Sequence, residues 1–121
     1  MLEYPVYRGD TELLHAIEAD TFWTRMRGLH ARPPLCGSQA LVIRPCNSVH
    51  TFRMKYVIDV AFLDGDGVIQ KLEEMKPGRV SWCRRANIVI EMRAGMVAKL
   101  SLTNGQTLNK EVGSWAHSSI N

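Results

Sequence analysis

The chain has 121 residues, of which 45% are hydrophobic and 22% are charged, with 15 Lys and Arg residues against 12 Asp and Glu residues. This composition excludes a disordered tail, a collagen-like chain and a coiled coil. The length predicts a single domain, residues 1–121, that can bury a core without disulfides. The net charge of +3 is only mildly basic, and the longest basic runs, residues 25–27 and 84–85, lie among apolar or neutral residues. We therefore favour solvated surface charge over a nucleic-acid-binding patch.

The sequence also predicts a location. No stretch reaches the roughly 18 apolar residues of a membrane span, and residues 1–5 do not resemble a signal peptide. We therefore expect a cytoplasmic protein without a membrane partner. Three cysteines, Cys36, Cys46 and Cys83, are then expected as free thiols.

The first half of the chain predicts a strand, a short helix and a second strand. A mostly apolar run favours a strand over residues 13–17. Residues 21–27 are predicted as a short amphipathic helix, because Asp20 begins an N-cap signal, apolar residues share one helical face and Gly28 can end the helix. The β-branched residues in 39–44 predict the next strand.

The strongest predicted strand covers residues 57–63, which are apolar almost throughout except for Asp59. Such a run is typical of a central strand that is buried on both faces. Residues 64–67 (DGDG) form a turn signal, so residues 68–75 are expected as the antiparallel partner strand. Three weaker elements follow: a strand over 88–92, a helix over 94–100 and a last strand over 106–112.

These elements predict an α+β fold: one compact domain with a mostly antiparallel or mixed sheet and two short helices. The helices do not alternate with the strands, which argues against a doubly wound sheet. The core is expected over residues 13–112, and the tail, residues 113–121, is expected to be loose.

The densest polar cluster is residues 46–51 (CNSVHT), placed between two predicted strands. His50 in this cluster is either an acid, base or ligand, or a structural histidine that hydrogen-bonds the backbone. If the protein is an enzyme, a hydrolase or transferase using His50 with Asp59, Asp64 or Cys46 is the most plausible form. The sequence leaves open whether it is an enzyme.

Carboxylates supply the other candidates. Asp59 inside an apolar strand is costly unless it is paired or hydrogen-bonded, so it is either a structural anchor or a functional acid. Asp64 and Asp66 lack the further oxygen ligands of an EF-hand, and the turn interpretation is favoured over a weaker magnesium or calcium site. The cysteines and histidines show no zinc-binding spacing, and nucleotide-binding loops are absent. The sequence therefore predicts no metal and no cofactor.

Two segments carry a family resemblance. Residues 19–32 (ADTFWTRMRGLHAR) are similar to the A-x-T-x-x-x-R-x-x-G-L-M-x-R stretch of the DUF192 family, with His30 in place of Met. Residues 48–64 (SVHTFRMKYVIDVAFLD) are similar to the family's S-I-H-T-x-x-M-x-x-P-I-D-V-x-F-L-D, with Val57 in place of Pro. A weaker match covers residues 88–95 (IVIEMRAG). The chain thus resembles a family of small bacterial and archaeal domains of unknown function.

The resemblance implies a compact α+β domain with a barrel-like sheet, and it implies no activity, cofactor or catalytic residue. By motif position it indicates a candidate binding site or a shared structural skeleton made of Arg25, Arg32, His50, Thr51, Met54, Asp59 and Asp64, and it also draws attention to Gly28, Glu91 and Gly95.

Two arrangements of these residues are equally plausible. The arginines could converge with His50 and Thr51 on a small anionic ligand, or Arg25 could pair with Asp59 or Asp64 to hold the helix against the sheet. We favour a small soluble binding or interaction module for a small polar or anionic ligand or a protein partner. The hydrolase or transferase is the first alternative, and a weak nucleic-acid binder is the second.

Overall fold

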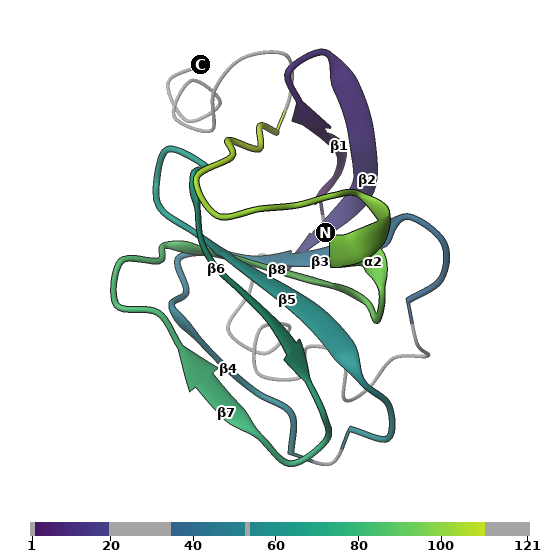
Figure 1. The fold of residues 1–121 in the computed structure, drawn as a ribbon, viewed down its shortest axis with the longest axis vertical. Coiled ribbons are helices and arrows are strands. Elements are labelled where there is room, and N and C mark those ends of the chain that lie inside the picture. The colour runs from purple at the N-terminus through teal and green to yellow at the C-terminus, as the bar shows by residue number, and fades with distance from the viewer. Residues whose placement is uncertain (1, 20–34, 53, 111–121) are drawn as a thin grey trace.

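The computed structural model describes residues 2–19, 35–52 and 54–110. In this part of the chain the regular structure consists of eight strands and one short helix (Figure 1). In chain order these are β1 (Leu2–Arg8), β2 (Thr11–Ala19), β3 (Gln39–Ile43), β4 (Ser48–His50), β5 (Ile58–Leu63), β6 (Ile69–Met75), β7 (Val80–Trp82), β8 (Ile88–Arg93) and α2 (Met96–Lys99).

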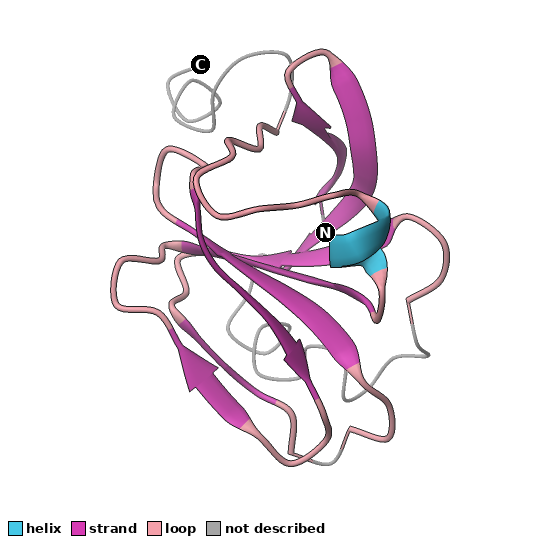
Figure 2. Ribbon diagram, viewed as in Figure 1, coloured by secondary structure: helices cyan, strands magenta, loops and turns pink. Residues whose placement is uncertain are grey.

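The prediction of an α+β fold with two helices is wrong, because the described residues are nearly all β (Figure 2). The helix expected over 94–100 is reduced to the four residues of α2. The helix expected over 21–27 lies outside the described residues, as does the tail 113–121. The strand content was underestimated for a physical reason. β4 and β7 are short and β1 is partly polar, so none of the three contains a long apolar run that would predict it.

Six strands form the main sheet, in the order β1-β2-β3-β8-β5-β6. Only β2 and β3 run parallel, and the other neighbours are antiparallel. β5 lies between β8 and β6, and all six of its residues are buried. This confirms the prediction of a central strand buried on both faces, and the antiparallel β5–β6 hairpin is confirmed as well.

The sheet is not closed into a barrel, so the barrel-like sheet implied by the family resemblance is wrong. The edge strands β1 and β6 do not pair with each other in the part of the chain that the structure describes. Instead, the segment 105–109 lies between them, with isolated bridges from Tyr7 to Asn109 and from Val68 to Thr107. Residues 106–110, the described part of the predicted last strand, therefore form bridges only.

Each face of the main sheet buries its own apolar cluster. The first cluster fills the space between one face, α2 and the segment around Leu102 and Leu108. The second lies on the opposite face and includes Val49 of β4 and Met54. Alternation along β5 separates the two, since Ala61 and Leu63 belong to the first cluster while Ile58, Val60 and Phe62 belong to the second.

Strands β4 and β7 pair with each other to form a separate antiparallel ribbon, which we call the β4–β7 ribbon. It covers the second cluster beside β6, where Lys71 Nζ donates to Ser81 Oγ at 2.9 Å and to the carbonyl oxygen of Trp82 at 3.1 Å. The polar segment predicted as a loop is therefore partly a strand. Among the described residues, no helix is long and apolar enough to cross a membrane.

Candidate functional site

The predicted site residues that the structure describes occupy separate places in the fold. Arg25 and Arg32 lie outside the described residues, so their convergence with the second motif remains a prediction. Met54 is buried in the second apolar cluster, where it serves as a core side chain.

Thr51 joins the end of β4 to the turn between β6 and β7. Its side chain is fully buried, and its hydroxyl donates to the carbonyl oxygen of Lys76 at 2.6 Å and accepts the N–H of Arg79 at 2.8 Å. Its backbone also accepts the N–H of Gly78 at 2.9 Å. All of these bonds are internal to the fold, so Thr51 acts as a structural tie.

Asp59 caps α2 from the neighbouring strand. Its carboxylate is 4% exposed, and Oδ2 accepts the N–H of Gly95 at 3.1 Å and the N–H of Val97 at 2.9 Å. These amides belong to the first turn of α2, whose donors have no partner within the helix. These two hydrogen bonds offset the free-energy cost of burying the carboxylate.

Asp64 holds the turn between β5 and β6. Its Oδ1 accepts the N–H groups of Asp66 at 2.9 Å and Val68 at 3.0 Å, and its Oδ2 accepts the side-chain amide of Gln70 at 3.2 Å. Asp59 and Asp64 lie five residues apart along an extended strand, which separates them by about 16 Å. They therefore cannot act on one small ligand.

His50 points away from the core on the β4–β7 ribbon and is exposed, with its ring stacked on that of Phe52 at a centroid distance of 5.1 Å. The ribbon covers the sheet face opposite to the one that carries Asp59, so the main sheet lies between His50 and Asp59. The thiol of Cys46 donates to the carbonyl oxygen of Ser48 at 3.1 Å. This geometry gives no support to a His50–Asp59 catalytic pair.

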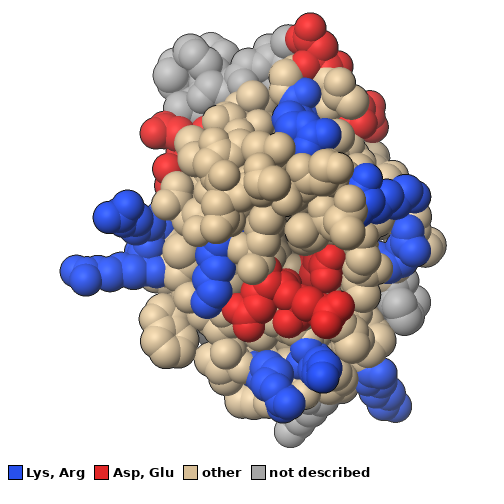
Figure 3. Space-filling model, viewed as in Figure 1, with Lys and Arg blue, Asp and Glu red and all other residues tan. Residues whose placement is uncertain are grey.

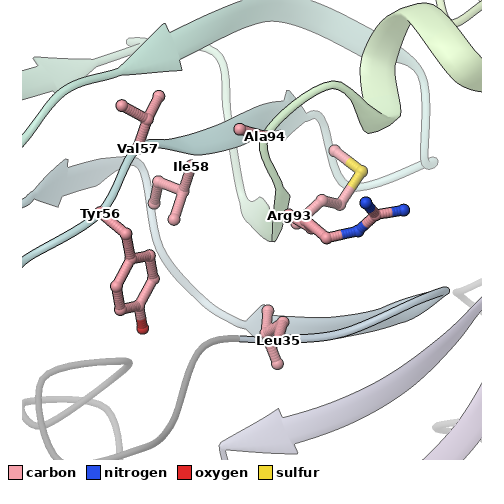
Figure 4. A pocket seen from close by; sticks show the side chains of 7 residues that line it. Leu35, Tyr56, Val57, Ile58, Arg93 and Ala94 are labelled. Carbon is pink, nitrogen blue, oxygen red and sulfur yellow. The ribbon is translucent and has the colours of Figure 1, made fainter.

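A pocket of about 160 Å³ opens at the ends of β5 and β8, on the side of the second cluster (Figure 4). It is lined by Leu35, Tyr56, Val57, Ile58, Met92, Arg93 and Ala94. Figure 4 shows Tyr56 and Arg93 on opposite sides, with Leu35 between them. The lining is therefore mostly apolar, with a phenol and a guanidinium as its polar groups, a combination common in small-molecule sites.

Arg93 contributes a cation that forms no ion pair with a carboxylate of the described residues. Its side chain is exposed, and the hydrogen bond that its guanidinium makes is a weak one from Nη2 to Met96 Sδ at 3.5 Å. No carboxylate of the described residues lies within ion-pair distance of it. A guanidinium in this state can bind a carboxylate or phosphate group with two parallel hydrogen bonds.

Glu91 lies beside the pocket on the same face of β8 as Arg93, because the two residues are separated by one position. The side chain is 5% exposed between Leu41 and Val60 of the adjacent strands, and burial raises the pKa of Glu91 to about 7. Burial, and then the charge of Glu91, raise the pKa of Tyr56. The carboxyl group and the phenol therefore share one electrostatic environment.

This pocket was not predicted from the sequence. Tyr56, two residues before β5, and Arg93, the last residue of β8, are 37 positions apart in the chain, and no local pattern joins them. Glu91 did carry a signal, since it interrupts an apolar strand as Asp59 does. Glu91 is also one of the positions to which the family resemblance draws attention, and a carboxylate in an apolar strand needs a compensating partner or a shifted pKa, as at Asp59.

A second hollow, of about 230 Å³, lies between β6 and α2 and is acidic. It is lined by Asp59, Leu72, Glu73, Glu74, Gly95, Val97 and Ala98, and Figure 3 shows acidic side chains gathered over this area. Asp59 is committed to α2, and Glu73 accepts a hydrogen bond from Ser81 Oγ. In the described ranges no three His, Cys, Asp or Glu side chains are arranged to hold a metal ion.

Comparison with known proteins gives matches over most of the chain. The model of the DUF192 family, described as an uncharacterised ACR, matches residues 6–110. A UPF0127 protein of Thermococcus sibiricus is 31% identical over 99 residues, which cover 78% of this chain and 64% of that protein. The matched region thus spans less than two thirds of this relative's length.

Two crystal structures share the fold. A protein of unknown function from Novosphingobium aromaticivorans matches with a TM-score of 0.76 and 15% identity, over 89% of this chain and 84% of that one. A protein of Sinorhizobium meliloti, described as a candidate transcription regulator, matches with a TM-score of 0.72 and 21% identity, over 79% and 81% of the two chains. At these identities the likeness concerns the fold.

Proposed function

The chain belongs to the DUF192 family of uncharacterised proteins, and we propose that it is a binding module for a small anionic molecule with a compact apolar body. The observation that carries the proposal is the pocket at the ends of β5 and β8, which combines an apolar lining with the available guanidinium of Arg93.

The size of the pocket limits the ligand. Its volume is about 160 Å³. A cavity of about 150 Å³ in another protein accommodates benzene, so one aromatic ring or a short branched aliphatic chain fits this space. Leu35 and Ile58, both members of the second cluster, offer the apolar contacts for such a body.

The polar groups determine the charge of the ligand. Arg93 favours a carboxylate or phosphate, since charge-assisted bidentate pairs are the strongest hydrogen bonds that a side chain makes. Burial and then Glu91 raise the pKa of Tyr56 above its usual value, which is already well above neutral pH, so the phenol adds no negative charge that would repel an anion. The three free thiols fit a reducing compartment, so we place this function in the cytoplasm.

Benzoate and its neutral analogue benzyl alcohol are suitable probes, measured on the full chain by isothermal titration calorimetry and by thermal shift. Benzoate is expected to raise the melting temperature and to bind more tightly than benzyl alcohol. Replacing the guanidinium in Arg93→Gln should weaken benzoate about tenfold or more, since hydrogen bonds to charged groups contribute about 1.5–3 kcal/mol. Benzyl alcohol should be affected little.

A pair of matched substitutions tests the location. Ala94→Leu is expected to fill the pocket and abolish binding, whereas Ala98→Leu, an exposed position on α2 that faces the other hollow, should leave binding unchanged. Equal binding of the two probes would refute the anion preference. Undiminished binding by the Ala94→Leu variant, with its fold intact by circular dichroism, would refute the site.

The enzyme alternative lacks a comparable observation. Asp59 and Asp64 use their carboxylates to hold α2 and a turn, and His50 lies on the far side of the sheet from Asp59. Binding without chemistry is therefore the function that the described residues support best.

A further inference from the structure

The outer face of the β4–β7 ribbon is a second surface, separate from the pocket. Because side chains alternate along a strand, Val49 and Ser81 point inward and are buried. Their neighbours point outward, and Trp82 and Val80 are 66% and 54% exposed. Large apolar side chains with this exposure on a well-packed ribbon indicate an interaction surface.

Aromatic rings dominate this outer face. Phe52, 49% exposed, stacks on His50 with an interplanar angle of 28°. Trp82 lies diagonally across the ribbon from His50, since Ser48 pairs with Trp82 and His50 pairs with Val80. Diagonal neighbours in an antiparallel pair are about 7–8 Å apart. We call the group His50, Phe52, Val80 and Trp82 the aromatic face.

The chain around the aromatic face is basic and contains no acidic residue. Residues 44–58 and 76–90, which contain the two strands of the ribbon, carry seven of the 15 Lys and Arg residues and none of the 12 Asp and Glu residues. Five of these cations are exposed in the structure: Lys55, Lys76, Arg79, Arg84 and Arg85. Basic side chains project from the side of the molecule where β7 leads into β8 (Figure 3).

The order of residues along β7 places these charges at both ends of the aromatic face. Arg79 directly precedes Val80, and Arg84 and Arg85 follow shortly after Trp82. The nearby carboxylate of Glu73 accepts the hydrogen bond of Ser81, an inward-pointing residue, and pairs with Lys71 at 3.3 Å. It is therefore engaged on the inner side of the ribbon.

We propose that the aromatic face binds a single-stranded nucleic acid. Unpaired bases stack on exposed aromatic rings, while Lys and Arg on either side contact the phosphates. The rings would have no such partner in a duplex, where the bases are already stacked. An acidic peptide would use the cations but not the flat rings, and a second copy of this surface would bring like charges together.

The full chain can be tested by fluorescence anisotropy with labelled oligo(dT) and oligo(U). A length of about 12 nucleotides falls within the range of site sizes that such surfaces bind. Saturable binding that weakens with salt is expected for one or both, and their comparison distinguishes DNA from RNA. A duplex of the same length should bind more weakly. Trp82→Ala should reduce affinity about tenfold, the effect of losing one stacked base, while Trp82→Phe should retain most of it.

The charge contribution has its own readout. Arg84→Ala combined with Arg85→Ala should reduce the slope of log affinity against log salt by about 1.4, because each phosphate that a cation neutralises on a single strand contributes about 0.7 to this slope. Arg84→Lys combined with Arg85→Lys should keep the slope. Leu2→Ala, another exposed apolar residue at 52% exposure, is the matched control and should change nothing.

Several results would overturn the proposal. These are no binding at low salt, equal losses in Trp82→Ala and Leu2→Ala, or an oligoglutamate peptide that binds as tightly as the oligonucleotides. A dimer in sedimentation experiments that Trp82→Ala dissociates would instead assign the surface to self-association. None of these results bears on the benzoate pocket, because the Trp82 variant leaves its lining untouched.

Discussion

Thr51 concentrates several hydrogen bonds on one buried hydroxyl. It satisfies the carbonyl oxygen of Lys76 and the amide of Arg79, both in the turn that leads from β6 into β7. Without it, these two part-buried backbone groups would lose their partner beside the fully buried Thr51 side chain. The residue therefore positions the β4–β7 ribbon, and with it the aromatic face.

A pair of substitutions measures this contribution. Thr51→Val keeps the shape but removes the hydroxyl, and should lower the free energy of unfolding by about 1–3 kcal/mol, the cost of orphaned buried polar groups. Thr51→Ser keeps the hydroxyl and should cost less, about 1 kcal/mol for the removed methyl group. Urea unfolding monitored by circular dichroism gives both values. Equal losses in the two variants would contradict the structural role.

At the scale of elements, α2 depends on a residue of another strand. It has four residues, begins after Gly95, whose φ of +93° favours glycine, and receives no side-chain cap from its own loop. A helix this short is unstable by itself. Asp59 of β5 supplies the missing acceptor for the amides of Gly95 and Val97.

Asp59→Ala should therefore loosen α2. The expected loss of unfolding free energy is about 2 kcal/mol, typical of the upper range for a removed cap. Hydrogen exchange at the amide of Val97 should accelerate more than at β5 itself. Asp66→Ala, a change of an exposed turn carboxylate, is the control and should leave this amide protected.

The strands show why sequence patterns succeed in some places and fail in others. β3, β5 and β8 are predicted because their apolar runs reflect burial within the main sheet, and β6 is predicted because the turn at residues 64–67 leads into it. β1 is missed although Tyr4 and Val6 alternate with less buried neighbours, and Pro5 fits its position at an edge of the sheet. β4 and β7 have three residues each, too few for any period to be visible.

At the scale of the whole molecule, stability depends on the protonation of Glu91. The folded state raises the pKa of this group to about 7, so between its unfolded value and pH 7 the folded protein holds a proton that the unfolded chain has released. Stability should therefore fall as pH rises from about 4.5 to about 7 and stay level above this range.

Glu91→Gln should remove this pH dependence and stabilise the protein above pH 7. The difference from the native chain at about pH 8 is expected to be of the order of 3 kcal/mol, and it should be small near pH 4.5. Urea unfolding at the two pH values measures it. The exposed carboxylate of Glu12 provides the control in Glu12→Gln. An unchanged pH profile in Glu91→Gln would show that another group governs it.

The candidate site is less predictable than the fold. The motif residues stand out in the sequence, but Thr51, Asp59 and Asp64 bond to the backbone of the fold, and the pocket is lined by residues such as Tyr56 and Arg93 outside the candidate set. Local sequence can indicate that a polar residue is unusual. It cannot indicate which distant atoms satisfy that residue.

The sequence by itself determined the buried strands, the turn at residues 64–67 and the membership of the family, because each of these rests on residues close together in the chain or on motif matches. Only the tertiary structure decided that the sheet stays open, that His50 and Asp59 lie on opposite sides of it, and that aromatic and basic residues from two segments share one ribbon. The physical reason is strand pairing. Which face a side chain occupies, and which neighbours it meets, is set by hydrogen-bonded partners that can lie far away in the chain, as Trp82 does from Ser48 and Met92 from Asp59.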